Sequence, residues 1–335
     1  MAKKALIVTY YWPPSGGSGV QRWLKFSKYL PEYDWEPIVY TPSNPEVSAT
    51  DASLLKDVPT GITVLKRKAF EPYKFFRLLT GRKANMGVGF ASADGKKQGL
   101  FSKLSLWLRA NYFIPDARMF WIKPSVRFLA KYLKDNPVNI VITTGPPHSM
   151  HLVGLGLKQR LGVKWVADFR DPWTNIDFFN DLPLTASAKK KHGKLERMVV
   201  QQADAVVVIS AQMKREFEVF REHGIEVITN GYDEEDFVNK EVELDNLFSI
   251  THIGSIPPNR NCKAFWKAIK SLTDGNKEFA SKLKINLIGS VDSSVVADVD
   301  LNGLTEYCED QGYIEHSQSV KIMMSSQVLL LLVNQ

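Results

Sequence analysis

Cysteine and long hydrophobic runs are both scarce in this sequence. Only two cysteines, Cys262 and Cys308, occur among 335 residues, and they do not form a C-x-x-C pair. This scarcity argues against a disulfide framework and a cysteine-based zinc site, and it fits a reducing compartment. Apolar runs stay far below the ~20 residues that a membrane-spanning helix needs. The longest obvious run, Val328 to Val333, is typical of a buried strand.

The N-terminus lacks the features of a secretory signal. Lys3 and Lys4 precede the apolar letters ALIV, but that run stops at Trp12-Pro13-Pro14 and no small-residue cleavage site follows. We therefore expect a mature N-terminus and a cytoplasmic protein.

Two common nucleotide-binding fingerprints are also missing. The first glycine loop reads YYWPPSGGSGVQRW, and Arg22 stands where G-x-G-x-x-G requires a third glycine after Gly17 and Gly19. The second predicted strand ends at Tyr40-Thr41, without the acidic residue that binds the ribose of NAD. No Gly-Lys-Ser/Thr follows the glycines. These absences count against a nicotinamide dehydrogenase and against a P-loop enzyme.

What the sequence does have is a repeated alternation of short apolar strands and amphipathic helices. Lys4 to Thr9 predicts a strand, Ser18 to Leu30 a helix and Pro37 to Thr41 a second strand, which together indicate a βαβ unit. Continuous apolar strands of this kind occur in parallel sheets that are covered on both faces. Further strands are expected at 139–144, 164–169, 205–209 and 226–229, and further helices up to 160, at 185–202 and at 211–223.

An acidic, polar stretch from Glu234 to Asp245 separates two such series, so we place a domain boundary after Tyr232. Residues 1–232 form the first predicted Rossmann-like domain and residues 233–335 the second. In the second domain we expect strands at 248–254, 284–289, 312–315 and 328–333, with helices at 262–272 and near Ser319. Because a parallel strand without a following helix leaves a face uncovered, we expect this domain to be incomplete.

A basic, aromatic insertion at about residues 66–120 interrupts the first predicted domain. Lys66 to Arg109 carries eleven basic and two acidic residues, a net charge of +9, whereas the whole chain has +7. Phe75 and Phe76, and later Trp107 and Leu108, stand beside basic residues in a pattern that suits the surface of an anionic membrane. The alternative is that the aromatic rings pack under the first domain and the lysines are solvated. We do not expect nucleic acid binding, since no recognition motif accompanies the charge.

The first glycine loop is a candidate binding element. Gly16 and Gly17 precede a predicted helix, where backbone N–H groups and the helix dipole favour an anion. The alternative is that these glycines only make a sharp turn between strand and helix.

Charged and polar residues follow two further strands of the first series. In TTGPPHSMH, His148 stands at a strand end where a neutral imidazole would hydrogen-bond a hydroxyl or phosphate, unless it only caps its own helix. His151, three residues on, is expected to pack. In ADFRDPW, the charges of Asp168, Arg170 and Asp171 either form a salt-bridge cluster that positions Trp173 or bind a polyol. These two interpretations are compatible.

The second domain repeats this arrangement. HIGSIPPNRN places Gly254 and Ser255 after a strand, with Arg260 and Lys263 near the start of the next helix. Arg260 is a candidate diphosphate ligand because a guanidinium group matches phosphate oxygens in a fork; the alternative is an ordinary surface arginine. Gly289, after the next strand, either approaches a nucleotide closely or simply turns the chain.

Taken in order, these motifs resemble those of the family 4-like retaining glycosyltransferases with the GT-B fold, bacterial surface-polysaccharide enzymes above all. The resemblance rests on GGSG, GPPHS, ADFRDPW, the junction ITNGYD and HIGS, and it covers nearly the whole chain outside the insertion. It implies an α/β protein of two Rossmann-like domains, with parallel sheets facing a cleft. It further implies sugar transfer from a UDP- or GDP-linked donor to a glycan or lipid-linked acceptor, next to the inner face of an anionic cytoplasmic membrane.

The resemblance also implies roles for individual residues. His148 and Asp168 become the catalytic candidates. The donor and its phosphates fall to Gly16, Gly17, Gly254, Ser255, Arg260, Lys263 and Gly289. The acceptor, or support of the site, falls to Arg22, Arg170, Asp171 and Trp173. No metal-ligand cluster is evident in the sequence, so neither a metal nor a cofactor besides the nucleotide sugar is expected.

Two departures from the family pattern lead to further expectations. Ser255 stands where many members have arginine directly after the glycine, so Arg260 and Lys263 must hold the diphosphate. The acidic E-x7-E motif of the family would begin where the chain ends at Gln335, so we expect this chain to have weak or no transferase activity. A noncatalytic glycan-binding protein of the same fold, or another nucleotide-sugar enzyme such as an epimerase, stays as an alternative.

Overall fold

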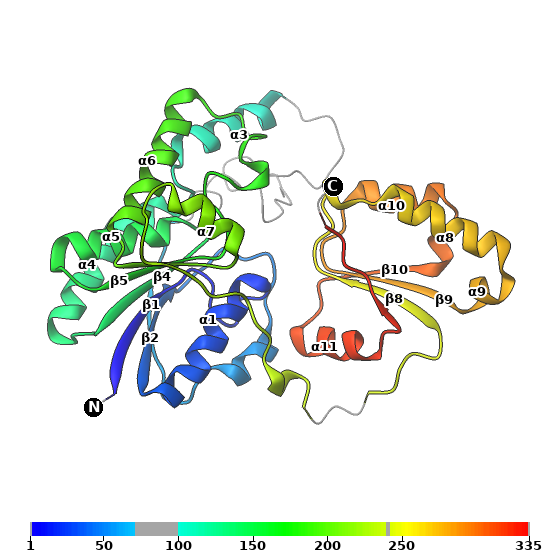
Figure 1. Cartoon of the computed structure of the whole chain (residues 1–335), viewed down its shortest axis with the longest axis horizontal. Helices are drawn as coiled ribbons and strands as arrows, with labels where there is room; N and C mark the ends of the chain where they lie inside the picture. Colours follow the sequence, from blue (N-terminus) through cyan, green and yellow to red (C-terminus); the bar gives the residue numbers. More distant parts are fainter. Residues whose placement is uncertain (1, 71–99, 239–241, 334–335) are drawn as a thin grey trace. The chain divides into compact units, whose positions relative to one another are not determined.

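A computed structural model describes residues 2–70, 100–238 and 242–333 of the chain, which form two compact units (Figure 1). The first unit extends to Tyr232, the main segment of the second unit begins at Asp233, and each unit has a parallel sheet of its own. Within the described part of the chain, no helix has both the length and the apolar character needed to cross a membrane.

The first unit is built on a seven-stranded sheet in which every neighbouring pair is parallel. The strand order is β3-β2-β1-β4-β5-β6-β7, so the chain starts in the middle and builds outward in both directions. The strands are β1 (Lys3–Val8), β2 (Trp35–Pro42), β3 (Thr63–Arg67), β4 (Ile140–Gly145), β5 (Trp165–Phe169), β6 (Ala205–Val208) and β7 (Ile225–Val227).

Helices cover both faces of this sheet, with α1 on the opposite face from α4 and α5 (Figure 1). Strand β1 shows why both faces need cover. Leu6 and Val8 belong to the larger apolar core, whereas Ile7 belongs to the core that α1 supplies. Alternate residues of a strand point to opposite faces, so a continuous apolar run fits a buried strand. The helices are α1 (Ser18–Tyr29), α3 (Leu100–Tyr112), α4 (Met119–Asp135), α5 (Ser149–Leu161), α6 (Ala186–Gln202) and α7 (Ala211–Glu218).

Two elements of the first unit differ from the sequence-based expectation. Strand β3 pairs with β2, from Thr63 opposite Ile38 to Arg67 opposite Pro42, so Lys66 and Arg67 are part of the sheet and not of an insertion. Helix α4, which includes the end of the expected insertion, packs on the sheet through Trp121, whose ring is stacked on Tyr40 with centroids 4.8 Å apart. The predicted helix face with Phe75 and Phe76 lies outside the described residues.

The second unit has a four-stranded parallel sheet in the order β10-β9-β8-β11. Its strands are β8 (Phe248–Ile253), β9 (Leu283–Ile288), β10 (Cys308–Gly312) and β11 (Val328–Leu329), and its helices are α8 (Lys263–Gly275), α9 (Lys277–Lys282), α10 (Ser293–Leu301) and α11 (His316–Ser325). The core of the unit is formed by side chains such as Trp266, Ile285 and Val295, from α8, β9 and α10.

Two strand predictions for the second unit were wrong in their limits. The strand expected at 312–315 is β10, which ends at Gly312, because the polar letters CEDQG pair with β9 as an edge strand. The strand expected at 328–333 is only Val328–Leu329, paired with Ile250 and Thr251.

Candidate functional site

The loops that carry the first unit's candidate residues meet at one edge of its sheet. Strands β1, β4 and β5 are direct neighbours and run in the same direction, so the segments that follow them leave the sheet side by side. The first glycine loop follows β1, the turn from Gly145 to His148 follows β4, and Arg170 follows β5. Ligands of open α/β sheets bind at this carboxyl edge.

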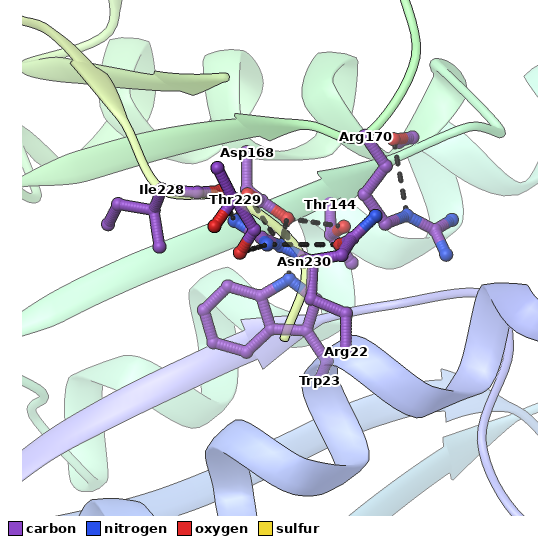
Figure 2. Close-up of polar contacts among 9 residues, drawn as sticks. Arg22, Trp23, Thr144, Asp168, Arg170, Ile228, Thr229 and Asn230 are labelled. Atoms are coloured by element: carbon purple, nitrogen blue, oxygen red, sulfur yellow. Dashed lines mark hydrogen bonds and ion pairs between the residues drawn. The ribbon is translucent and has the colours of Figure 1, made fainter. Parts of the chain in front are cut away.

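A buried ion pair lies at the centre of this edge (Figure 2). Arg22, on α1, places a terminal guanidinium nitrogen 3.0 Å from Asp168 Oδ1 and its Nε 3.2 Å from the same oxygen. Both side chains are almost completely inaccessible to solvent. A charged pair in such a place needs further hydrogen bonds to compensate for the lost hydration of both groups.

Those further hydrogen bonds are present on both sides of the pair. Asp168 Oδ2 accepts a hydrogen bond from Trp23 Nε1 at 2.7 Å and one from Thr144 Oγ1 at 2.8 Å. The other guanidinium hydrogens of Arg22 are donated to the carbonyl oxygens of Ile228 and Thr229, both at 2.9 Å. The pair therefore joins α1, β4 and β5 to the segment after β7, and the carboxylate oxygens of Asp168 already have donors.

Arg170 makes a second set of contacts along the edge, and all of these are with backbone oxygens. Its Nε donates to Gly145 O at 3.3 Å, and its two terminal nitrogens donate to the carbonyl oxygens of Gly19 and Pro146. The guanidinium thus connects the first turn of α1 to the turn that follows β4. Burial lowers the pKa of Arg170, and the carboxylates of Asp168 and Asp171 act in the opposite direction. Burial likewise raises the pKa of Asp171, an effect that Arg170 opposes.

His148 lies directly after that turn, as the residue that precedes α5. Its ring is parallel to the indole of Trp173, with centroids 4.7 Å apart, and Trp173 in turn donates from Nε1 to His192 Nδ1 at 3.0 Å. Burial, and then the positive charge of Arg170, lower the pKa of His148 to about 3. The imidazole is therefore neutral at physiological pH.

The Nδ1 atom of His148 is a buried polar group of this site that lacks a protein partner among the described residues. It is buried, and no described residue forms a hydrogen bond with it. The Nδ1 atom faces Gly145, because a Cβ atom added to that glycine would lie 3.1 Å from it. A buried polar atom without a partner costs free energy unless a ligand or water supplies the hydrogen bond.

A second histidine, for which the sequence indicated only a packing role, faces the same glycine. His151 Nδ1 is 3.0 Å from Thr143 Oγ1, which itself accepts a hydrogen bond from Trp165 Nε1. The direction of the hydrogen bond between Thr143 Oγ1 and His151 Nδ1 depends on which ring nitrogen of His151 carries the proton. A Cβ atom at Gly145 would lie only 2.5 Å from His151 Nε2, which also finds no partner in the described part of the structure. Gly145 is thus required for both imidazoles to occupy their positions.

Asp116, which the sequence analysis did not identify, caps the N-terminus of α5. Asp116 accepts hydrogen bonds from the backbone N and from Oγ of Ser149, both at 2.8 Å. A carboxylate at this place stabilises the first turn of a helix. Asp116 lies 33 positions before Ser149, so no local capping pattern could have indicated it.

The first glycine loop has one unusual backbone conformation. Gly17 precedes α1 with φ 91° and ψ 170°, a combination that residues with a Cβ atom almost never adopt. No side chain caps α1. Gly17 is exposed, and Gly16 donates its N–H to Ala49 O at 3.0 Å. The loop therefore presents backbone at the start of a helix, as the anion-binding interpretation requires.

In the second unit, the structure brings two candidate glycines into contact. Gly254 follows β8 with φ 146° and Gly289 follows β9 with φ 120°. A Cβ atom at Gly289 would lie 2.0 Å from Gly254 O, so only glycine fits there. Ser255 and Lys263 are exposed and Arg260 is half-buried, all three between β8 and the first turn of α8.

His252 adds a buried imidazole beneath Gly254 that the sequence did not single out. Its Nδ1 is 3.0 Å from Leu330 O, and its Nε2 is buried and has no partner among the residues described. The nearest side-chain atom to a Cβ added at Gly254 would be this Nε2, at 3.5 Å.

The sequence of residues 92–236 matches the model of Glycosyltransferase Family 4. This stretch, somewhat under half of the chain, is therefore similar to Glycosyltransferase Family 4. The matched stretch contains His148, Asp168, Arg170 and Trp173, whereas the first glycine loop and Arg22 lie before it. No curated protein sequence matches the chain.

Solved structures show the same fold at low sequence identity. A mutant of TarM from Staphylococcus aureus, in complex with fondaparinux, α-GlcNAc-glycerol and UDP, is 9% identical with a TM-score of 0.59, over 99% of this chain and 81% of that one. A trehalose-6-phosphate structure from Escherichia coli, bound with UDP-2-fluoro glucose, is 13% identical with a TM-score of 0.59, over 98% and 78%. A putative UDP-N-acetylglucosamine 2-epimerase from Listeria monocytogenes is 8% identical with a TM-score of 0.51, over 98% and 74%.

These matches confirm the α/β class and the GT-B fold that the sequence predicts, with Rossmann-like units and parallel sheets. The match over residues 92–236 is consistent with the family that the sequence motifs resemble, and it supports glycosyl transfer in general terms. The roles of single residues stay predictions.

Proposed function

We propose that this protein transfers a sugar from a UDP- or GDP-linked donor to a glycan or lipid-linked acceptor, with retention of the anomeric configuration, in the synthesis of a cell-surface polysaccharide. The family 4 match supports the reaction class. The reported neighbours bound with UDP or with UDP-2-fluoro glucose support a nucleotide-sugar donor.

The observation that carries the proposal is the neutral imidazole of His148. It is fixed against Trp173 at the carboxyl edge of the sheet, and its Nδ1 lacks a protein partner among the described residues. A neutral imidazole forms hydrogen bonds with sugar hydroxyls or phosphate oxygens without adding a charge. We therefore assign His148 the contact with the transferred sugar or its phosphate.

Asp168 and its neighbours support this contact from behind. Because Arg22, Trp23 and Thr144 already donate to the carboxylate, we assign Asp168 a positioning role in place of direct participation in the reaction. Arg170 fixes the turn before His148 through Gly145 O, and we place the acceptor near Asp171 and Trp173.

The second unit supplies the groups that suit a leaving diphosphate. Gly254 follows β8 and Gly289 follows β9, so no side chain covers the backbone after these two strands. Arg260 and Lys263 add positive charge. Charge that develops on a leaving phosphate is stabilised by fixed donors and cations of this kind. The diphosphate is already a good leaving group, so we propose no metal and no cofactor besides the donor.

Donor binding tests the proposal without requiring turnover. A panel of UDP- and GDP-sugars, with NAD(P) as the negative control, should be compared by thermal shift. At a concentration of 100 times Kd, a bound donor adds about 2.7 kcal/mol to the free energy of unfolding. His148→Phe keeps an aromatic ring against Trp173 and should reduce donor stabilisation or transfer. Stabilisation by NAD(P) alone would overturn the proposal.

An epimerase is the second candidate, because a putative UDP-N-acetylglucosamine 2-epimerase shares the fold. Product analysis separates the two activities. A transferase releases free nucleotide only when an acceptor is present, whereas an epimerase returns an isomeric nucleotide sugar without one.

We further propose that the protein works in the cytoplasm, at the inner face of an anionic membrane, since a lipid-linked acceptor would be held there. The basic charge of Lys66 to Arg109 supports this location.

A further inference from the structure

Helix α3 has an unusual distribution of apolar side chains. A surface helix normally buries its apolar face and exposes its polar one. In α3 the exposed side carries Leu104, Trp107, Leu108 and Tyr112, with exposed fractions of 55%, 37%, 43% and 63%. Their spacing of three, one and four residues keeps them on one side of the helix. This face therefore presents apolar side chains to the surroundings.

The composition of the face suits a lipid surface better than water. Trp107 and Tyr112 are in edge contact, with ring centroids 6.0 Å apart. Trp and Tyr concentrate at the boundary between lipid headgroups and acyl chains, where one end of the ring is apolar and the other is hydrated. Lys103 is exposed on the same helix.

Several lysines lie in the N-terminal half of α6, next to the C-terminal end of α3. Asn111, on α3, donates from Nδ2 to Pro183 O at 2.8 Å and accepts from the backbone N of Thr185 at 2.7 Å. Thr185 caps α6, so the first turns of α6 begin beside the end of α3 (Figure 1). The exposed basic residues of these turns are Lys189, Lys190, Lys191 and Lys194.

These lysines have no acidic counterpart on their own helix surface. Glu196, the acidic residue of α6, is buried and accepts hydrogen bonds from the backbone N and Oγ1 of Thr174. Within the described residues, none of the four lysines forms an ion pair. Asp177 and Asp181 are exposed in the loop before α6, and two acidic residues against four lysines leave an excess of positive charge.

We propose that the exposed face of α3 and the first turns of α6 form a docking surface for an anionic lipid bilayer. Leu104, Trp107, Leu108 and Tyr112 enter the headgroup region, and the lysines of α6 contact lipid phosphates. Neither part alone explains both features, because one apolar helix face gives weak binding and surface charge alone is screened by salt. The biological meaning of this inference rests on the proposed function, but its test does not involve sugar.

Vesicle sedimentation of the whole chain tests the surface. Vesicles of phosphatidylglycerol mixed with phosphatidylcholine should bind the protein, and binding should fall as salt is added, whereas pure phosphatidylcholine should bind it weakly. Leu104→Ser with Leu108→Ser should weaken binding at least about tenfold, as should Lys190→Glu with Lys194→Glu.

Matched controls lie in the second unit. Leu301→Ser removes an apolar side chain that is 82% exposed, and Lys267→Glu with Lys277→Glu reverses two exposed charges. Both control variants should bind the vesicles as the unmodified protein does. A depth measurement adds a direct test, because brominated lipids should quench Trp107, and Trp107→Phe should remove that part of the quenching while it keeps vesicle binding.

Three results would overturn the inference. The protein could bind neither kind of vesicle, or the α3 and α6 variants could bind as well as the controls. Alternatively, the leucine variants could convert a dimer into a monomer without a change in vesicle binding, which would make a second copy of the chain the occupant. Donor stabilisation measured on the same samples separates this inference from the proposed function, since either one can fail while the other holds.

Discussion

Arg22 and Asp168 lie 146 positions apart in the sequence, and their charged groups are 3.0 Å apart in the interior of the first unit. The pair is surrounded by further donors and acceptors from β4 and from the segment after β7. An ion pair of this kind is costly to break, because removal of one partner leaves the other charge buried and uncompensated.

Arg22→Met should therefore destabilise the first unit by about 3 to 5 kcal/mol. Native-state hydrogen exchange at the amides of β5 measures this loss. The control is Lys270→Met, which removes an exposed pair with Asp274 at 2.8 Å and should cost at most about 0.5 kcal/mol. If Arg22→Met cost no more than the control, the pair would not hold the edge together.

Acid should weaken the protein through His192. Burial lowers the pKa of this side chain to about 4, whereas in the unfolded chain it titrates near its ordinary value of 6.5. Below pH 6.5 the unfolded state binds a proton that the folded state does not, so stability falls as the pH decreases towards 4. Linkage gives a loss of roughly 2 kcal/mol between pH 7 and pH 5 from this residue.

His192→Gln keeps an acceptor for Trp173 Nε1 and should remove that part of the acid sensitivity. Denaturant unfolding at pH 8, 7, 6 and 5 measures the slope for both proteins. Equal stability at pH 8 would show that the variant retains its packing. An unchanged slope below pH 7 would mean that His192 is protonated in the folded state.

Gly17 provides a test of the first glycine loop. Alanine meets no atom within 4 Å there, but φ 91° with ψ 170° strains any residue that has a Cβ atom, at a cost of about 1 to 3 kcal/mol. The backbone N–H groups before α1 should then move, so Gly17→Ala should lose donor stabilisation, and Gly17→Val should lose it completely while the unit stays folded.

The control for Gly17 is Gly193→Ala in α6, where a Cβ atom also has open space. It should be neutral or stabilising by up to about 1 kcal/mol, because alanine favours a helix. Donor binding by Gly17→Val at the level of the unmodified protein would reduce the loop to a turn.

Gly289→Ala should disrupt the second unit locally. Its Cβ atom would overlap Gly254 O at 2.0 Å, so the two strand ends must separate, at a cost on the order of 3 kcal/mol. Faster hydrogen exchange at the ends of β8 and β9 would report the separation, together with weaker donor binding. Gly275→Ala, where a Cβ atom meets nothing, should change neither measurement. Normal exchange at β8 in Gly289→Ala would contradict the close contact.

The sequence predicted most of the parallel strands, because their apolar runs are what a covered sheet requires. It failed at strands with a polar surface. Strand β3, TVLKR, has only half-buried or exposed side chains, and β10, CEDQG, pairs with β9 alone. Helix α4 was not predicted, although its Trp121 is one of the most deeply buried side chains.

The sequence predicted where the candidate site lies in the fold, but it did not predict which residues contact one another there. Strand ends identified His148, Asp168 and Arg170, since neighbouring parallel strands must end together. The partners could not be predicted, because Arg22 meets Asp168 only after the sheet has formed, and Asp116 reaches Ser149 from a different part of the chain. His151 was expected to pack, and its Nε2 beside Gly145 shows that a packing position can still present a polar atom.

The Arg170 guanidinium group joins the carbonyl oxygens of Gly19 and Pro146, which belong to two different turns. During synthesis, neither turn has its final support until the ribosome has released residue 170. Any exchange of these loops between related proteins must therefore transfer the glycine loop, the turn before His148 and Arg170 as one set. A single transplanted loop would arrive without the cation that holds its backbone in place.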